Sequence, residues 1–246
     1  KRVQSRIADA LELIQDAAAV ERAEAATATD LRAAAMQHLF TCGLQGGPQL
    51  ETEIGPIPQG WKIGPLGNLA LFQRGFDITK SAQSEGGTVP VVSSGGVKSF
   101  HDVAAVSGPG VVIGRKGSIG SVHYVSSDYW PHDTTLWCKD FLGNLPKFVY
   151  YRLQLVDMKR LDSGAANPAL NRNFLHAEVT SWPDVDEQQQ IVEVLEAIDR
   201  KIELHSRKRD VLGQLFESLL HKLTTGAISI DDLDLSALPS VDGSAA

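Results

Sequence analysis

The 246-residue sequence contains only two cysteines, Cys42 and Cys138, which lie far apart and lack the spacing of metal ligands. It therefore gives no support to a zinc centre or a disulfide framework, and it favours a reducing compartment such as the cytosol. No hydrophobic run approaches the length of a membrane span, and no stretch reads as a signal peptide. With 43% hydrophobic and 22% charged residues, the composition is that of an ordinary globular protein. We expect a cytoplasmic protein with no metal site and no membrane partner.

Motifs that would indicate an enzyme are also missing. The glycine-rich stretch Gly114–Gly120 lacks the spacing of a phosphate-binding loop, and its glycines suit a hairpin turn between two expected strands. Asn167-Pro-Ala169 lacks the second proline and the aromatic residue of the amino-methyltransferase loop. His132-Asp133 is more typical of a turn than of a catalytic dyad. We therefore predict a chain with no catalytic residues and no cofactor of its own.

Positive charge is scarce overall but is concentrated in the middle of the chain. The formal net charge is −7. Residues 55–180 hold 12 Lys and Arg against 9 Asp and Glu, whereas residues 181–246 hold 6 against 13. Phosphate binding requires local cations, so the acidic total does not exclude DNA binding by the middle segment. Arg115 and Lys116, adjacent in the expected turn, suit a phosphate or the edge of a guanine.

The sequence does contain a long amphipathic helix near its C-terminus, predicted from Glu187 to Thr225. Asp184, three residues before Glu187, resembles the start of a capping box, and Gly226 suits a C-cap. Seam positions follow at alternating steps of four and three, which is the spacing of a coiled coil. A helix of about 39 residues would be about 58 Å long and would need a partner helix along its seam. The seam positions are Ile191, Leu195, Ile198, Ile202, His205, Arg209, Leu212, Phe216, Leu219 and Leu223.

A second copy of this helix pattern occupies residues 4–43. Because the two copies flank a middle segment, direct pairing within the chain would make them antiparallel. A seam glutamate of the first helix, Glu21, would then lie near Arg209 and set the register. The alternative is that the heptads serve only oligomerisation. The predicted seam positions of the first helix are Ile7, Leu11, Ile14 and Glu21.

Short apolar runs separated by Gly, Ser and Asp fill the middle segment and indicate strands joined by tight turns. A helix is expected at Pro146–Met158, packed on the sheet. The predicted fold class is α+β, with a β-rich domain inserted between two long helices that form an antiparallel coiled coil. The expected strands are Thr88–Val92, Gly110–Ile113, Ser121–Val125 and Thr134–Cys138. The expected boundaries are a helix at 1–43, a linker at 44–60, the β-rich domain at 61–182, the second helix at 183–226 and an acidic tail at 227–246.

Six motifs give the sequence its most specific character. They are Ile57-Pro-Gln-Gly-Trp61, Leu66-Gly-Asn-Leu69, Gly110-Val-Val-Ile-Gly-Arg-Lys-Gly-Ser-Ile-Gly120, Asn167-Pro-Ala-Leu-Asn171, Trp182-Pro-Asp-Val-Asp-Glu-Gln-Gln-Gln-Ile191 and His221-Lys-Leu-Thr-Thr-Gly226. With them the chain resembles the specificity (S) subunit of Type I restriction-modification systems. It departs from the family in having Trp182-Pro183 in place of the usual Pro-Pro, and in showing one target-recognition domain where two are typical.

The resemblance implies a non-catalytic reader of double-stranded DNA whose β-rich domain recognises one half of a split target. The helices would act as a spacer and would dock methyltransferase (M) subunits on their outer, charged face. These subunits would bring S-adenosylmethionine and the adenine-methylating site, and a restriction (R) subunit would join for cleavage. The partners expected are DNA, the M and R subunits and, where the chain is a half-subunit, a second copy of itself.

Polar loops that carry a cation are the candidates for DNA contact. Arginine and asparagine can bond base edges bidentately, whereas lysine more often contacts phosphate. The predicted DNA-binding residues are Arg74, Lys80, Ser94, Lys98, Arg115, Lys116, Arg172 and Asn173. Two other functions stay open at this point: a coiled-coil scaffold whose middle domain binds protein, and the target domain of a fused restriction-methyltransferase. Within the favoured interpretation, the chain is either half of a two-domain subunit or a half-subunit that dimerises.

Overall fold

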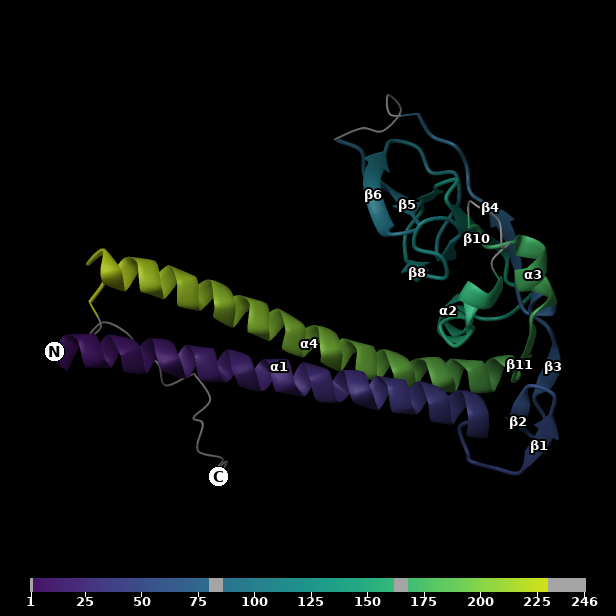
Figure 1. Cartoon of the computed structure of the whole chain (residues 1–246), viewed down its shortest axis with the longest axis horizontal. Helices are drawn as coiled ribbons and strands as arrows, with labels where there is room; N and C mark the ends of the chain where they lie inside the picture. Colours follow the sequence, from purple (N-terminus) through teal and green to yellow (C-terminus); the bar gives the residue numbers. More distant parts are fainter. Residues whose placement is uncertain (1, 80–85, 162–167, 230–246) are drawn as a thin grey trace. The chain divides into compact units, whose positions relative to one another are not determined.

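The computed structural model describes residues 2–79, 86–161 and 168–229, with the side chains of the first helix described from Ser5 onward (Figure 1). The chain forms two compact units, which we describe separately. Residues 1–35 and 194–246 make up the helical unit, and residues 36–193 make up the central unit. Both cysteines are free thiols. No helix among the described residues is long and apolar enough to span a membrane, and no group of three His, Cys, Asp or Glu side chains within these ranges could hold a metal ion.

The helical unit pairs the N-terminal part of α1 (Arg2–Cys42) with the C-terminal part of α4 (Val185–Thr224) in antiparallel orientation (Figure 1). Its core consists of seam side chains from both helices, which exclude water where the two faces meet. Every predicted seam residue is buried or half-buried. The buried members of this core are Ala10, Ile14, Leu219 and Leu223, and Ile7, Leu11, Leu212 and Phe216 pack against them.

Polar pairs follow the apolar seam along the helical unit. Glu21 accepts a hydrogen bond from His205 Nδ1 at 2.5 Å, and Lys208 Nζ lies 3.5 Å from its other carboxylate oxygen. The predicted pairing of Glu21 with Arg209 is wrong, because Arg209 lies one turn farther along α4 and its guanidinium bonds the adjacent Asp210 at 2.7 Å. Burial alone would raise the pKa of Glu21, but the hydrogen bond from His205 and the charge of Lys208 hold it below the ordinary value. The pair still supplies the polar seam position that we expected to set the register.

The main sheet of the central unit is four-stranded and antiparallel, in the order β4-β10-β7-β8. One of its two inner strands, β7, reads Gly-Val-Val-Ile-Gly and is buried throughout, as an uninterrupted apolar run predicts. Helix α2 (Pro146–Leu153) packs on β7 and β8, and Phe148 and Tyr151 on this helix are fully buried. The strands of this sheet are β4 (Leu71–Arg74), β7 (Gly110–Gly114), β8 (Val122–Val125) and β10 (Thr135–Asp140).

Further strands among the described residues form smaller sheets. One has the order β6-β5-β9, in which β5 pairs antiparallel with β6 and parallel with β9. The others are the antiparallel pairs β1-β2 and β3-β11. Their bounds are β1 (Gln49–Thr52), β2 (Gly55–Pro58), β3 (Lys62–Pro65), β5 (Val89–Ser93), β6 (Gly96–His101), β9 (Trp130–Pro131) and β11 (Val179–Trp182).

Two sequence-based expectations differ from the structure in the central unit. Within residues 44–60, expected to be a linker, β1 and β2 form a hairpin, because Gly and Pro are tolerated in short edge strands. The helix expected at Pro146–Met158 ends at Leu153 and is followed by tighter turns and the 3-10 helix η3 (Met158–Leu161). The remaining short elements are the 3-10 helix η1 (Leu66–Asn68) and α3 (Arg172–Ala177).

Helix α4 begins at a dense set of hydrogen bonds within the central unit. Asp184 caps the helix by accepting from the Glu187 backbone N–H at 2.9 Å. The Glu187 carboxylate accepts from the Leu44 N–H at 3.1 Å and from the Trp61 indole N–H at 3.0 Å. The capping-box prediction is therefore only half right, because this carboxylate bonds the residues that follow α1. The next residue, Gln188, is fully buried, and its side chain makes three hydrogen bonds.

Candidate nucleic-acid interface

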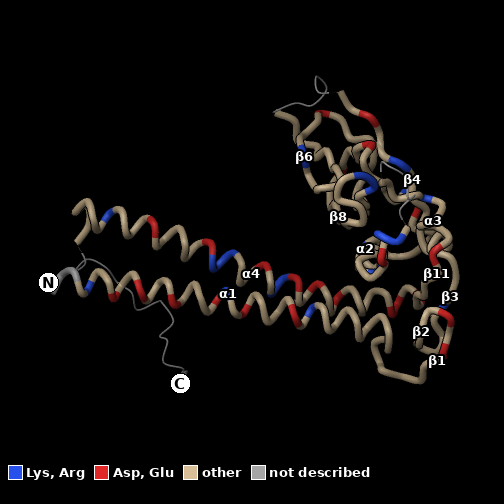
Figure 2. Tube along the Cα trace, in the orientation of Figure 1, with Lys and Arg blue, Asp and Glu red and all other residues tan. Residues whose placement is uncertain are grey.

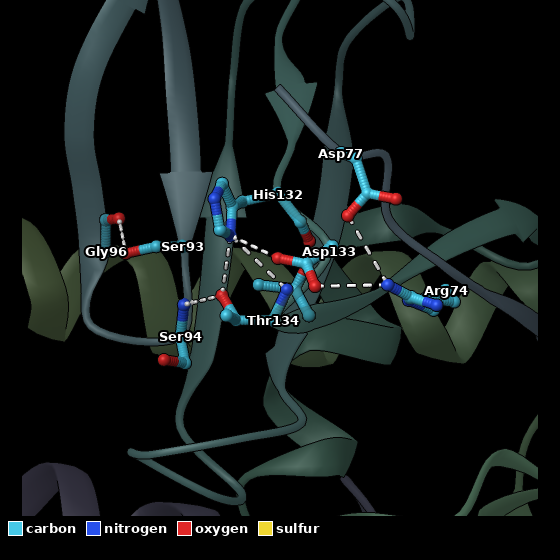
Figure 3. Close-up of polar contacts among 9 residues, drawn as sticks. Arg74, Asp77, Ser93, Ser94, Gly96, His132, Asp133 and Thr134 are labelled. Carbon is cyan, nitrogen blue, oxygen red and sulfur yellow. Dashed lines mark hydrogen bonds and ion pairs between the residues drawn. The ribbon is translucent and has the colours of Figure 1, made fainter. Parts of the chain in front are cut away.

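The turn that precedes β10 joins two loops of the central unit. The carbonyl oxygen of Thr134 accepts hydrogen bonds from the backbone N–H groups of Arg115 at 2.8 Å and Lys116 at 3.1 Å. The Thr134 hydroxyl oxygen lies 3.4 Å from the backbone nitrogen of Ser94, on the β5-β6 turn (Figure 3). One residue thus holds the cation-bearing β7-β8 turn and the β5-β6 turn side by side.

The β7-β8 connection is the hairpin turn that the glycines predicted. Gly117 and Gly120 have φ values of 73° and 82°, which glycine adopts without steric cost. Inside the turn the Ser121 hydroxyl donates to the backbone oxygens of Ser94 and Ser118. His123 on β8 places its Nε2 3.0 Å from the same Ser94 oxygen. These bonds order both turns, so their exposed side chains start from a fixed backbone.

Arg74 ends β4 and is held by two carboxylates. Its Nη2 lies 3.1 Å from Asp133 Oδ2 and 3.4 Å from Asp77 Oδ1 (Figure 3). Asp133 also lies 2.9 Å from His132 Nδ1, and these two residues form the turn that the sequence indicated. The ion pairs neutralise much of the Arg74 charge, which leaves this arginine less able to attract a phosphate than an unpaired cation would be.

A pocket of about 360 Å³ brings Arg74, Arg115 and Arg172 together. Leu136 and Leu170 also line it, although each is only 1% exposed. The rest of the lining comes from Ala169, Asn171 and Asn173. Three guanidinium groups around one concave surface are suited to an anion or to the hydrogen-bond acceptors of a base.

Arg115 has a guanidinium nitrogen without a partner. Its Nη1 is buried and makes no hydrogen bond with the residues that the structure describes. Its backbone is fixed on both sides, since its N–H donates to Thr134 and its carbonyl oxygen accepts from the Leu170 N–H at 2.9 Å. A buried donor without an acceptor is costly, so a movement of this guanidinium that gives the nitrogen an acceptor would be favourable.

Helix α3 is positioned by an asparagine cap and a neutral histidine. The Asn171 side chain accepts from the Asn173 N–H at 2.8 Å, which fixes the first turn that carries Arg172. His176 Nε2 accepts from the Phe72 N–H at 2.8 Å and ties α3 to β4. Burial, together with the charge of Arg172, lowers the pKa of His176. Both effects favour the neutral ring that this hydrogen bond requires.

The predicted DNA-binding residues fall into three groups in the structure. Arg74, Arg115, Arg172 and Asn173 line the pocket, and Ser94 and Lys116 lie on the two turns joined by Thr134. Lys98 is exposed on β6, in a different sheet. Lys80 lies outside the described residues. Figure 2 shows Lys and Arg at the end of β4, near β8 and on α2.

Sequence reasoning missed three residues that shape this surface: Thr134, Asp133 and Asn171. Thr134 acts through its backbone oxygen, which any residue possesses, so nothing in the sequence marked it. The ion pair of Asp133 with Arg74 joins residues 59 positions apart. Asn171 did carry a signal, because asparagine immediately before a short helical segment is a common N-cap.

The model of the Type I restriction modification DNA specificity domain matches residues 58–214. The putative type I restriction enzyme MjaX specificity subunit of Methanocaldococcus jannaschii is 24% identical over 214 residues, which is 79% of this chain and 50% of that protein. The chain thus spans half the length of this curated relative.

Solved structures share the fold at low sequence identity. The S subunit of a Type I restriction-modification system from M. genitalium superposes with a TM-score of 0.70 at 17% identity, covering 91% of this chain and 61% of that one. The HsdS subunit from Thermoanaerobacter tengcongensis gives 0.60 at 15% identity, covering 92% and 58%. The α+β fold with a sheet-rich domain between two long helices is therefore the one predicted. Because the family model covers well over half of the residues, the chain belongs to the Type I restriction modification DNA specificity domain family.

Proposed function

We propose that this chain is the non-catalytic DNA-reading part of a Type I restriction-modification specificity subunit and recognises one half of a bipartite DNA target. The observation that carries the proposal is the surface of the central unit, where ordered turns present Arg115, Lys116 and Arg172. Family membership supports it, and so does the charge of residues 55–180, which is positive within an acidic chain. In this proposal the domain boundaries given by the sequence separate a DNA reader from its helical spacer.

The partners in this proposal are methyltransferase subunits, with a restriction subunit joining for cleavage. S-adenosylmethionine belongs to the methyltransferase, and this chain contributes no catalytic group. We place methyltransferase docking on the helical unit, which exposes apolar side chains outside its seam. Val20 and Leu31 on α1 are 49% and 53% exposed, and Leu204, Val211 and Leu215 on α4 are 51%, 61% and 37% exposed. The α4 residues are spaced by seven and four positions, so they share one helix face that a further helix can cover.

The test is DNA binding by the chain assembled with its methyltransferase, using the double variant Arg115→Ala and Lys116→Ala. We expect weaker binding to target duplex and a flatter dependence of log Kd on log salt, because each lost phosphate contact removes about 0.9 from the slope. Lys62→Ala is the matched control, since Lys62 is exposed on β3, away from the pocket lining. Unchanged affinity of the double variant at several salt concentrations would contradict the proposed surface.

Because the chain spans half the length of its curated relative, two assemblies are consistent with the proposal, and native mass measurement can distinguish them. A chain that supplies one half of a two-domain subunit binds the methyltransferase without pairing with itself. A half-subunit instead gives a complex with two copies of this chain, which reads a palindromic split site. Mass measurement of the chain alone and with the methyltransferase distinguishes the two.

A further inference from the structure

We infer that Arg115 reads a guanine base, and that its neighbour Lys116 contacts the phosphate backbone. This assignment rests on the proposed function and names the chemistry recognised at one position of the target. It divides the cations of the surface into a group that supplies sequence specificity and a group that supplies affinity. The division follows from differences in backbone support, pairing and exposure between these residues.

Hydrogen bonds on both sides hold the backbone of Arg115 in place. Arg115 directly follows β7, and its peptide groups are bonded to the turn before β10 on one side and to Leu170 on the other. These two segments lie far apart in the sequence, so the Cα of Arg115 is fixed by tertiary structure. Base readout needs a donor held in a defined place, because a bidentate contact tolerates little displacement. A phosphate contact makes no such demand, and a mobile lysine satisfies it.

The state of pairing separates Arg115 from Arg74 within the same pocket. Arg74 already bonds Asp133 and Asp77, whereas the buried Nη1 of Arg115 has no acceptor among the described residues. A guanine presents two acceptors, O6 and N7, in one plane at the major-groove edge. The arginine fork matches that pair, and a guanidinium that turns outward to such a contact would give the buried nitrogen an acceptor.

The surroundings favour a base over a phosphate at Arg115. Leu136 and Leu170 line the pocket beside Arg115, and apolar neighbours are less costly to a neutral base edge than to a charged phosphate. The carboxylates of Asp133 and Asp77, paired with Arg74 at the pocket, would repel a phosphate that came close. Lys116 is exposed on the turn, and no ion pair holds it within the part of the chain that the structure describes. It is therefore free to follow the DNA backbone.

The experiment compares the DNA sequences selected by four complexes of the full chain with its methyltransferase: wild type, Arg115→Ala, Arg115→Lys and Lys116→Ala. Each complex selects from a library of random-sequence duplexes. We expect the wild-type motif to contain a guanine at which Arg115→Ala loses discrimination by roughly 5- to 150-fold, the range for one bidentate contact. Arg115→Lys keeps the charge but not the fork, so it should lose the same preference. Lys116→Ala should weaken binding to all sequences alike and keep the motif.

A modified base gives a second readout. Replacing that guanine by 7-deazaguanine removes the N7 acceptor, so wild-type affinity should fall while the affinity of Arg115→Ala should not change. Co-purification with the methyltransferase and unaltered tryptophan fluorescence establish that each variant is folded. If the wild-type complex selects no sequence, the proposed function fails together with this inference. If it selects a motif that Arg115→Ala or Arg115→Lys retains in full, only the guanine assignment is overturned.

Discussion

Gln188 offers the sharpest test of how the central unit is held together. This side chain is fully buried near the start of α4. Its carbonyl oxygen accepts from the Leu145 N–H at 3.0 Å, and its amide nitrogen donates to Asn144 Oδ1 at 2.8 Å and to the Pro183 carbonyl oxygen at 3.1 Å. Gln188→Leu keeps a similar volume but removes all of these bonds. The substitution therefore isolates the polar contribution.

The expected loss follows from the groups left behind. A buried donor or acceptor without a partner costs about 1–3 kcal/mol. The Pro183 contact is buried, so its oxygen should be near the upper end of this range, whereas Leu145 and Asn144 are partly exposed and should cost less. The free energy of unfolding of the central unit should fall by about 3–5 kcal/mol in total, a large part of the stability of an ordinary domain.

Urea unfolding followed by tryptophan fluorescence measures this loss, because all four tryptophans lie between residues 61 and 182. The control is Gln190→Ala, an exposed position two residues farther along the same helix, which should change stability by less than about 0.5 kcal/mol. If Gln188→Leu unfolds within about 1 kcal/mol of the wild type, the hydrogen bonds of Gln188 do not stabilise the unit as described.

Two further predictions concern the helical seam and the response to acid. Glu21→Ala and His205→Ala should each destabilise the helical unit by about 1–3 kcal/mol and show a coupling energy near 1 kcal/mol in a double-mutant cycle. The losses of unfolding free energy caused by Arg209→Ala and Glu21→Ala should be additive, and a coupling between them would support the pairing that the structure contradicts. These losses are measured by far-UV circular dichroism, because the helical unit has no tryptophan in its sequence. The response to acid depends on His176, whose pKa in the folded state lies below its ordinary value of 6.5. The hydrogen bond that its ring accepts from the Phe72 N–H therefore stabilises the fold above pH 6.5, and this stabilisation is lost as the pH falls through the lowered pKa. His176→Gln, which accepts without titrating, should weaken this acid destabilisation in melts between pH 7 and 5, and an unchanged pH profile would count against the bond.

The long helices and three strands of the main sheet, β7, β8 and β10, could be predicted because their signals are local, whereas β4 was not among the expected strands. The seam repeat predicted α4 from Glu187 to Thr225, and the helix runs from Val185 to Thr224. Continuous apolar runs between glycine-rich turns marked β7, β8 and β10. The two-stranded sheets escaped prediction because their strands are four residues long and gain stability only from pairing. Strand β3, for example, pairs with β11 more than a hundred residues away.

The residue types of the candidate surface could be anticipated from the sequence, but which of its cations are already paired could not. Glycines on both sides of the two cations predicted a surface turn correctly for Arg115 and Lys116. Whether an arginine is free depends on neighbours that local sequence does not show. Asp133 neutralises Arg74 from 59 residues away, and Lys98 lies on a strand of another sheet. Tertiary contacts therefore decide which of the equivalent cations can meet a ligand.

The carboxylate of Glu187 bonds both Leu44, where the chain has just left α1, and Trp61. Gly43 lies so close that a Cβ there would sit 3.1 Å from the same carboxylate. The side chain of Glu187 thus holds the start of the 44–186 segment next to its end. A segment with adjoining ends can be replaced by another of different length without moving the helices that flank it.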